Sequence, residues 1–137
     1  MSFVLDASAT LAAFLPDERN GFAVELVRRL VSERATVPAL WAAEIANSLH
    51  MARRRGRIDD AFVAVALEDL LGLPLDVDRD DPRKRMSTHL RMAKQLGLSV
   101  YDVIYLELAS RLQLPLATCD KRLSAAAKRT GVALVAP

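Results

Sequence analysis

Two aspartates follow short apolar runs, at places where a carboxylate could take part in chemistry. Asp6 follows the run from 3 to 5, and Asp120 follows the run from 116 to 119. In an open α/β sheet the carboxyl ends of the strands line the crevice where ligands bind, so acids there are well placed for catalysis or metal binding. An Asp between a strand and a helix is also a favoured helix N-cap, and both interpretations stay open from these residues alone.

Asp102 is a third candidate, because it shares a helical face with apolar residues. The residues at 98, 105, 106 and 109 lie on this face. Burying an ionised carboxylate costs several kcal/mol unless the group is paired or coordinated. A capping box, with Ser99 as the N-cap and Asp102 as the third helical residue, explains the local spacing but not the apolar surroundings.

Glu44 is the fourth candidate and the only charged residue between Arg34 and Arg53. Asn47 and Ser48, one turn further along, form a small polar stripe with it on an otherwise apolar helix. A single Glu at the edge of such a helix is usually just exposed to solvent. A functional interpretation of Glu44 therefore depends on the other three acids.

Four carboxylates that converge would raise one another's pKa values and destabilise the fold unless a cation neutralised them. Oxygen ligands of this kind suit Mg²⁺ or Mn²⁺, which can activate a water for attack on a phosphodiester. The sequence offers no competing machinery. His50 and His89 stand apart from other ligand types, and there is neither a Gly-rich phosphate loop nor a Gly-x-Ser-x-Gly motif. The single cysteine, Cys119, excludes an internal disulfide and a cysteine-based zinc site.

The elements that must position these acids alternate between short apolar runs and longer helical patterns, which is typical of an α/β fold. The chain has 137 residues, is 52% hydrophobic and 26% charged, and carries a formal net charge of +2. This composition excludes a disordered tail and predicts one domain over residues 1–137. We expect a mostly parallel five-stranded sheet flanked by helices, with strands at 3 to 6, 35 to 38, 75 to 77, 114 to 118 and 132 to 135. Helices are expected at about 8 to 15, 19 to 33, 40 to 55, 59 to 71, 83 to 97, 100 to 112 and 121 to 130.

The sequence shows no sign of targeting out of the cell or into a membrane. The apolar opening stops at Asp6 without a basic leader, and no stretch approaches the ~18 apolar residues that a membrane span needs. We therefore expect a cytoplasmic protein.

Four segments together resemble the signature regions of PIN-domain proteins. They are Phe3-Val4-Leu5-Asp6-Ala7-Ser8, then Pro38-Ala39-Leu40-Trp41 through Glu44 and Asn47, then Gly97-Leu98-Ser99-Val100-Tyr101-Asp102 through Tyr105 and Ala109, and finally Leu116-Ala117-Thr118-Cys119-Asp120 through Leu123 and Gly131. More narrowly, the chain is similar to the VapC toxins of bacterial and archaeal toxin–antitoxin pairs. The resemblance spans essentially the whole chain, although residues 75 to 94 match no fixed motif.

This resemblance implies a PIN-like domain that cleaves RNA internally and leaves a 5′-phosphate and a 3′-hydroxyl. Asp6, Glu44, Asp102 and Asp120 would then form the catalytic quartet around Mg²⁺ or Mn²⁺, with Asp6 and Asp102 as the expected direct ligands. Ser8, Asn47 and Thr118 would support these carboxylates as polar neighbours.

The same resemblance implies three partners: an RNA substrate, a cognate antitoxin protein and a second copy of the chain in a homodimer. A groove near the helices at 40 to 55 and 59 to 71 would receive a segment of the antitoxin. The apolar residues of these helices could equally be ordinary core.

Basic residues gather near two of the acids. Arg53, Arg54, Arg55 and Arg57 end the helix that bears Glu44, and Lys121 and Arg122 follow Asp120 directly. We expect RNA contacts among these six, although the helix dipole alone favours cations at a helix C-terminus. With the quartet set aside, 19 basic and 13 acidic residues remain, which indicates a basic exterior around an acidic centre. Glu107 and Arg111, four residues apart, are expected to form a solvated helix pair.

Other functions fit the sequence less well. A PIN-fold binding protein without activity would usually lack one of the four acids, and none is missing. A phosphotransfer enzyme of the haloacid-dehalogenase type would need a second Asp where Ser8 stands. A housekeeping role in RNA processing stays open as an alternative to a toxin.

Overall fold

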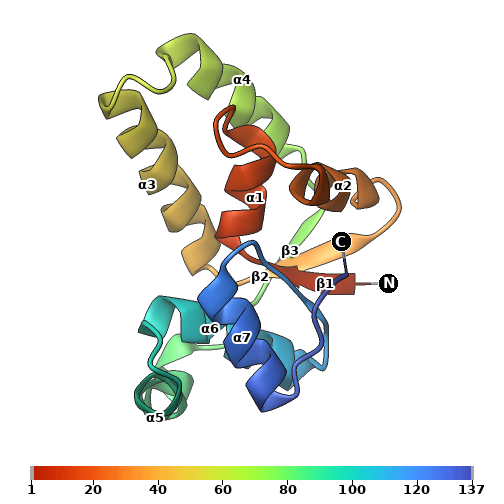
Figure 1. The fold of residues 1–137 in the computed structure, drawn as a ribbon, viewed down its shortest axis with the longest axis vertical. Coiled ribbons are helices and arrows are strands. Elements are labelled where there is room, and N and C mark those ends of the chain that lie inside the picture. Colours follow the sequence, from red (N-terminus) through yellow and green to blue (C-terminus); the bar gives the residue numbers. More distant parts are fainter. Residues whose placement is uncertain (1, 137) are drawn as a thin grey trace.

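A parallel sheet runs through the centre of the molecule in a computed structural model that describes residues 2–136 (Figure 1). Its strands are β1 (Ser2–Leu5), β2 (Arg34–Val37), β3 (Leu75–Val77) and β4 (Leu116–Ala117). They lie in the order β3-β2-β1-β4, and every adjacent pair is parallel. The predicted α/β fold with helices around a parallel sheet is therefore confirmed.

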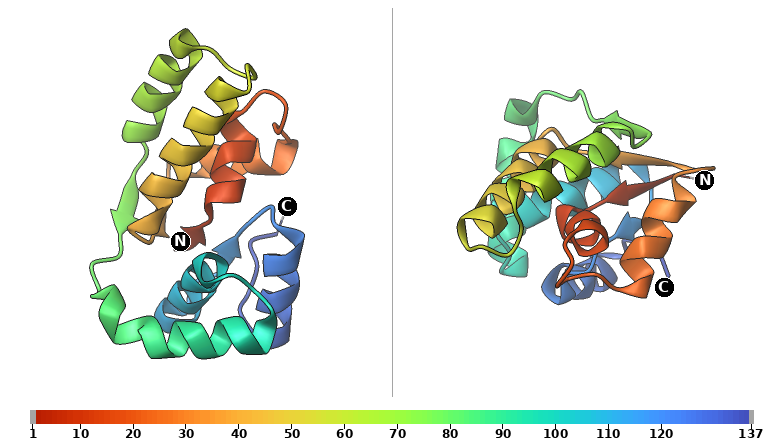
Figure 2. Two further views of the ribbon diagram at one scale, coloured as in Figure 1. Left: turned by 90° about the vertical axis from the view of Figure 1, so that its left-hand side faces the viewer. Right: turned by 90° about the horizontal axis from the view of Figure 1, so that it is seen from above.

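The helices form two groups on either side of this sheet (Figures 1 and 2). One group contains α1 (Ala7–Phe14), α2 (Gly21–Arg29), α3 (Leu40–Arg54) and α4 (Asp60–Leu71). The other contains α5 (Met86–Leu96), α6 (Val100–Leu112) and α7 (Lys121–Thr130), and a short 3-10 turn, η1 (Pro82–Arg85), leads into α5. Within residues 2–136, no helix is both long and apolar enough to cross a membrane.

Strands β1 and β4 are buried along nearly their whole length. Phe3, Val4 and Leu5 of β1 and both residues of β4 are at most 1% exposed. Strands covered by helices on both faces need such continuous apolar runs, which is why β1 reads as an unbroken apolar segment in the sequence. A polar residue follows each of these apolar strands directly, Asp6 after β1 and Thr118 after β4.

The expected fifth strand at 132 to 135 is wrong, since the described chain forms only an isolated bridge between Leu116 and Leu134 there. Two backbone bonds hold this segment, from Leu116 N–H to the Ala133 carbonyl and from Val135 N–H to the Leu116 carbonyl. The reason is the shortness of β4. A two-residue strand that follows Pro115, which has no N–H, cannot support a longer ladder.

Two helices differ from the sequence prediction for local reasons. The helix expected at 19 to 33 is shorter at both ends. The Asn20 side chain caps the start of α2 by accepting the Ala23 N–H at 2.9 Å, and residues 30 to 33 form turns that lead into β2. The helix expected at 83 to 97 is divided into η1 and α5. Pro82 begins η1, and the side chain of Asp81 caps it by accepting the Arg83 N–H at 3.0 Å.

Candidate active site

Asp6 lies at the carboxyl end of β1 and is only 5% exposed. Its carboxylate accepts hydrogen bonds from the Ser8 hydroxyl at 2.7 Å, from the Thr118 hydroxyl, and from the Ser8 N–H at 3.3 Å. The last bond makes Asp6 the N-cap of α1. Burial raises the pKa of Asp6, and the nearby charge of Asp120 adds to this rise. The hydrogen bonds from Ser8 and Thr118 lower the pKa but do not outweigh burial. The capping interpretation is thus confirmed for Asp6, and the carboxylate is also buried among hydroxyls.

Ser8 and Thr118 join the ends of β1 and β4. Their hydroxyl oxygens lie 3.2 Å apart, and the backbone N–H of Cys119 donates to the Ser8 hydroxyl at 3.1 Å. Asp120 N–H in turn donates to the Thr118 hydroxyl at 3.0 Å. These bonds fix two aspartates from opposite ends of the chain at one edge of the sheet.

Asp120 and Asp102 both lie at helix N-termini. Asp120 caps α7 by accepting the N–H groups of Arg122 at 2.8 Å and Leu123 at 3.0 Å. Ser99 caps α6 by accepting the Asp102 N–H at 3.1 Å, as the capping alternative predicts. The Asp102 carboxylate is left partly exposed, and its pKa is raised by burial and then by the charges of Asp120 and Asp6.

Glu44 reaches the same place from α3. The Tyr105 hydroxyl donates a hydrogen bond to Glu44 Oε1 at 2.6 Å. The pKa of Glu44 is raised by burial first and then by the charges of Asp6 and Asp102, against the lowering effect of the Tyr105 bond. Each of the four acids therefore lies within electrostatic range of at least one other, and together they come from β1, α3, α6 and the end of β4.

This acidic cluster has no basic partner in direct contact. None of the ion pairs in the described residues involves Asp6, Glu44, Asp102 or Asp120. Repulsion and burial together leave a negative site that a divalent cation would relieve, and carboxylate oxygens are the donors that Mg²⁺ and Mn²⁺ prefer. The chemistry of the donor set therefore fits such an ion. The four carboxylates do not form a complete coordination site as they lie, because no three His, Cys, Asp or Glu side chains in residues 2–136 converge closely enough to hold a metal.

Residues 3–129 match the family described as PIN domain. The chain belongs to the PIN-domain family. Among its relatives, Ribonuclease VapC3 of Pyrobaculum aerophilum is 30% identical over 126 residues, which cover 90% of this chain and 93% of that protein. Ribonuclease VapC12 of Mycobacterium tuberculosis is 34% identical over 121 residues, or 88% of each chain. A crystal structure of PAE2754 from Pyrobaculum aerophilum has the same fold, with a TM-score of 0.71 and 26% identity over 92% of this chain and 84% of that one.

Asn47 is less closely connected to the acids of this PIN domain than the sequence suggests. It lies on α3 one turn after Glu44 and is exposed. Within the part of the chain that the structure describes, its side chain has no hydrogen bond to Glu44 or to the other three acids. A supporting role for Asn47 stays a prediction.

The six basic residues predicted to contact RNA divide into two groups. Arg53 pairs with Asp60 and Arg57 with Asp17, while Arg122 donates to the Gly97 carbonyl at 2.8 Å and so caps the end of α5. Arg54, Arg55 and Lys121 are exposed, and none of them belongs to an ion pair among the described residues. These three remain available to a phosphate backbone.

Glu107 is not the solvated residue that its spacing from Arg111 predicts, because it is only 6% exposed. Arg111 donates to Glu107 at 3.0 Å and also to Asp78 at 2.8 Å, and Arg85 lies 3.6 Å from Glu107. The i,i+4 pair is therefore real but belongs to a buried network between α6, η1 and the segment after β3. His89 also packs in this region and is buried, and burial lowers its pKa.

Tyr105 is a site residue to which the sequence assigned no role, although it lies on the apolar face of α6 and in the third PIN-like segment. It is 1% exposed and carries the hydrogen bond to Glu44 described above. Burial, together with the negative charges of Glu44 and Asp6, raises its pKa far above the ordinary phenol value, so the hydroxyl keeps its proton. The sequence offers one sign of this role. Tyr105 lies one turn after Asp102 on an otherwise aliphatic face of the helix, and a buried phenol usually needs a polar partner.

Proposed function

We propose that this PIN domain is a Mg²⁺- or Mn²⁺-dependent endoribonuclease that acts in the cytoplasm as the toxin of a toxin–antitoxin pair. The observation that carries the proposal is the cluster of four carboxylates at one edge of the sheet, with no basic partner in contact. Three of them, Asp6, Glu44 and Asp102, have raised pKa values. The ribonuclease names of its VapC relatives support RNA as the substrate.

Each acid has a distinct part in this proposal. Asp6 and Asp102 would bind the metal directly, with Asp6 held in place by the Ser8 and Thr118 hydroxyls. Glu44 and Asp120 would complete the negative site from α3 and from the start of α7. A divalent ion bound there would lower the pKa of a coordinated water and stabilise charge on the phosphodiester.

The basic residues near the site suggest how RNA would approach. Lys121 follows Asp120 directly and is exposed, so it is the basic residue that lies nearest in the chain to one of the four acids. Arg54 and Arg55 lie at the far end of α3, roughly 15 Å along the helix from Glu44 at 1.5 Å per residue. Contacts to several phosphates would make RNA binding weaken steeply with salt.

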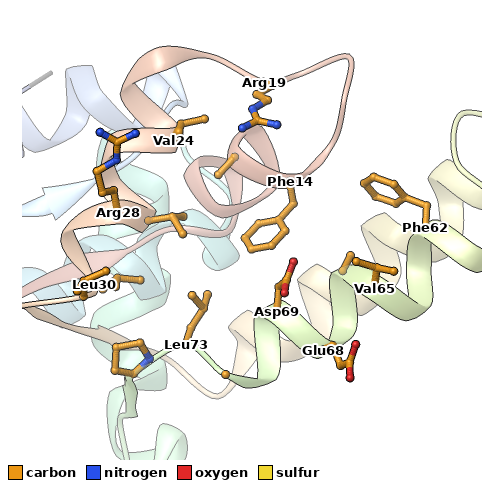
Figure 3. Close-up of a pocket in the computed structure, with 16 residues that line it drawn as sticks. Phe14, Arg19, Val24, Arg28, Leu30, Phe62, Val65, Glu68, Asp69 and Leu73 are labelled. Carbon is orange, nitrogen blue, oxygen red and sulfur yellow. The ribbon is translucent and has the colours of Figure 1, made fainter.

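A groove between α1, α2 and α4 supports the antitoxin part of the proposal (Figure 3). Its volume is about 840 Å³, and the apolar residues that line it include Phe14, Phe62 and Val65. Trp41, Ile45, Leu49 and Leu70 are instead buried in the core, as the core interpretation of these helices predicts.

Charges of opposite sign border the two sides of this groove. Arg19 and Arg28 come from the segment around α2, and Glu68 and Asp69 come from α4 (Figure 3). We assign the groove to a segment of the antitoxin with apolar side chains for this apolar lining and an acid that faces the two arginines. Homodimer formation stays a prediction from the family resemblance.

Cleavage of RNA by the purified chain, free of any partner, tests the activity. We expect cutting of single-stranded and structured RNA in Mn²⁺ or Mg²⁺, and no cutting in EDTA or by Asp6→Asn and Asp102→Asn variants. Glu25→Gln, which changes an exposed acid on α2, is the matched control and should cut normally. Equal cutting by the wild type and the two Asn variants, or cutting that survives EDTA, would show that the assignment of the acids is wrong.

The toxin assignment needs a separate test. We expect the small protein encoded beside this chain to copurify with it and to suppress its cleavage of RNA. If the chain cleaves RNA but the protein encoded beside it neither binds nor inhibits it, the chain would instead be an RNA-processing nuclease.

A further inference from the structure

The phenol of Tyr105 connects the two groups of helices at the edge of the sheet where the acids lie. Tyr105 is on α6, whereas its partner Glu44 is on α3, 61 positions away in the sequence. These helices belong to opposite sides of the sheet (Figure 1). The 2.6 Å bond between them therefore fixes the position of an acid from one side relative to an acid, Asp102, that lies one turn before Tyr105 on the other.

The geometry of this bond leaves Glu44 able to bind something else. The Tyr105 hydroxyl occupies Oε1, and no hydrogen bond to Oε2 is present among the described residues. A phenol is neutral, so it orients the carboxylate without cancelling its charge as an Arg or Lys would. Glu44 thus keeps one carboxylate oxygen without a hydrogen-bond partner and has no cation in contact with it.

The burial of Tyr105 makes the orientation rigid. Its side chain is almost fully enclosed in the core, and its neighbours on α6, Leu106 and Leu108, are at most 1% exposed. A ring packed in this way has few alternative rotamers, so the hydroxyl presents its proton in one direction. The Glu44 side chain, which is only partly buried, would be free to turn toward solvent without that bond.

We propose that Tyr105 is a positioning residue that holds Glu44 with its free carboxylate oxygen available to the divalent metal or to a water bound to that metal. This inference rests on the proposed metal-dependent function. Tyr105 itself touches neither metal nor RNA and acts only through Glu44.

Replacement of Tyr105 by Phe tests the role of the hydroxyl alone, because the ring and its packing are retained. Loss of a hydrogen bond that orients a metal ligand typically weakens metal binding by about 10-fold to 100-fold. We expect Tyr105→Phe to weaken Mn²⁺ binding, measured by calorimetry or by the EPR signal of free Mn²⁺, by about tenfold. RNA cleavage at limiting Mn²⁺ should fall in parallel and recover when the Mn²⁺ concentration is raised.

Tyr101→Phe is the matched control, since Tyr101 is on the same helix but is 61% exposed. It should bind Mn²⁺ like the wild type. A double-mutant cycle with Glu44→Gln then asks whether Tyr105 acts through Glu44. If it does, Tyr105→Phe should have little further effect on Mn²⁺ affinity in the Glu44→Gln background.

A measurement on the unmodified chain covers the case in which Tyr105→Phe does not fold. The protein has only two tyrosines, so ¹³C labelling of the tyrosine rings gives two sets of resonances that Tyr101→Phe assigns. We expect the Tyr105 resonance to shift as Mg²⁺ saturates the site and the Tyr101 resonance to stay unchanged.

The possible outcomes separate this inference from the proposed function. Three results would each overturn the positioning role and leave the proposed nuclease function standing. They are normal Mn²⁺ affinity in a folded Tyr105→Phe variant, additive effects in the double-mutant cycle, and a Tyr105 resonance that does not shift with Mg²⁺. A wild-type chain that neither binds Mn²⁺ nor cuts RNA would overturn both.

Discussion

At the scale of single residues, the acids of this PIN domain serve two purposes at once. Asp6 and Asp120 are N-caps that stabilise α1 and α7, and they also contribute negative charge to the edge of the sheet. N-capping usually stabilises a helix by about 1 kcal/mol, so these positions favour Asp even without chemistry. The cluster becomes unusual only because Glu44 and Asp102, which cap nothing with their carboxylates, point their charge at the same place.

Removal of one charge from the cluster should therefore stabilise the protein when no metal is bound. We expect Asp102→Asn to raise the melting temperature of the metal-free chain by a few degrees, because it relieves repulsion from Asp120 and Asp6. Addition of Mg²⁺ should stabilise the wild type more than the variant. Thermal melts with EDTA and with Mg²⁺ measure both effects, and a variant that melts below the wild type in EDTA would contradict the repulsion.

The pH dependence of stability follows from the same acids. The pKa values of Asp6, Glu44 and Asp102 are raised in the folded chain, so the unfolded chain releases these protons first as pH rises. Their contribution to stability is therefore lost as pH increases from the ordinary carboxylate pKa of about 4 through the raised values. Denaturation of the metal-free chain by urea should show this loss on the alkaline side of pH 4, and Asp102→Asn should reduce it. Saturating Mg²⁺ should also reduce it, since the ion favours the ionised carboxylates.

At the scale of the elements, Thr118 is the residue that ties β4 to β1 through Asp6. Replacement by Val preserves the shape of the side chain but removes the hydroxyl that contacts Asp6 and accepts from Asp120 N–H. We expect Thr118→Val to lower stability by about 1–3 kcal/mol, because it leaves a buried carboxylate oxygen short of a donor. Urea denaturation measures this change. Thr130→Val, at the exposed end of α7, is the matched control. Its hydroxyl donates to the Ala126 carbonyl of the same helix, at a place where water can replace it, so this change should cost less than Thr118→Val.

The partly buried network around Glu107 connects α6 to η1 and to the chain after β3. Arg111 keeps Asp78 and Arg85 keeps Asp80 when Glu107 is changed, so no charge is left without a partner. We expect Glu107→Gln, which weakens the bonds to the buried Glu107 side chain, to cost about 1–3 kcal/mol in urea denaturation. Asp76→Asn, in the exposed pair with Arg34, should cost less than about 1 kcal/mol. Equal effects of the two changes would mean that burial does not strengthen the Glu107 network.

At the scale of the whole molecule, the acidic cluster and the groove in Figure 3 are built from different residues. Of the lining residues, Val65 is 59% exposed on α4, so a charge placed there should not disturb the core. We expect Val65→Glu to abolish suppression by the antitoxin while RNA cleavage by the free chain stays unchanged. Cleavage assays with increasing antitoxin measure this, and Glu25→Gln is again the control. Normal suppression of Val65→Glu would place the antitoxin elsewhere.

The sequence by itself determined the family of the chain and the helices and strands on which the four candidate acids lie. This was possible because strand ends, N-caps and apolar runs are local patterns, each readable within a few residues. Only the tertiary structure decided which partners those residues meet. The Tyr105 bond to Glu44 spans 61 positions. Glu107 pairs with Arg111 of its own helix as its spacing predicts, but Arg85 from η1, and Asp78 through Arg111, come from other elements. The predicted fifth strand at 132 to 135 was wrong because strand formation also depends on a distant partner. Its neighbour β4 has only two residues, which allow a single bridge.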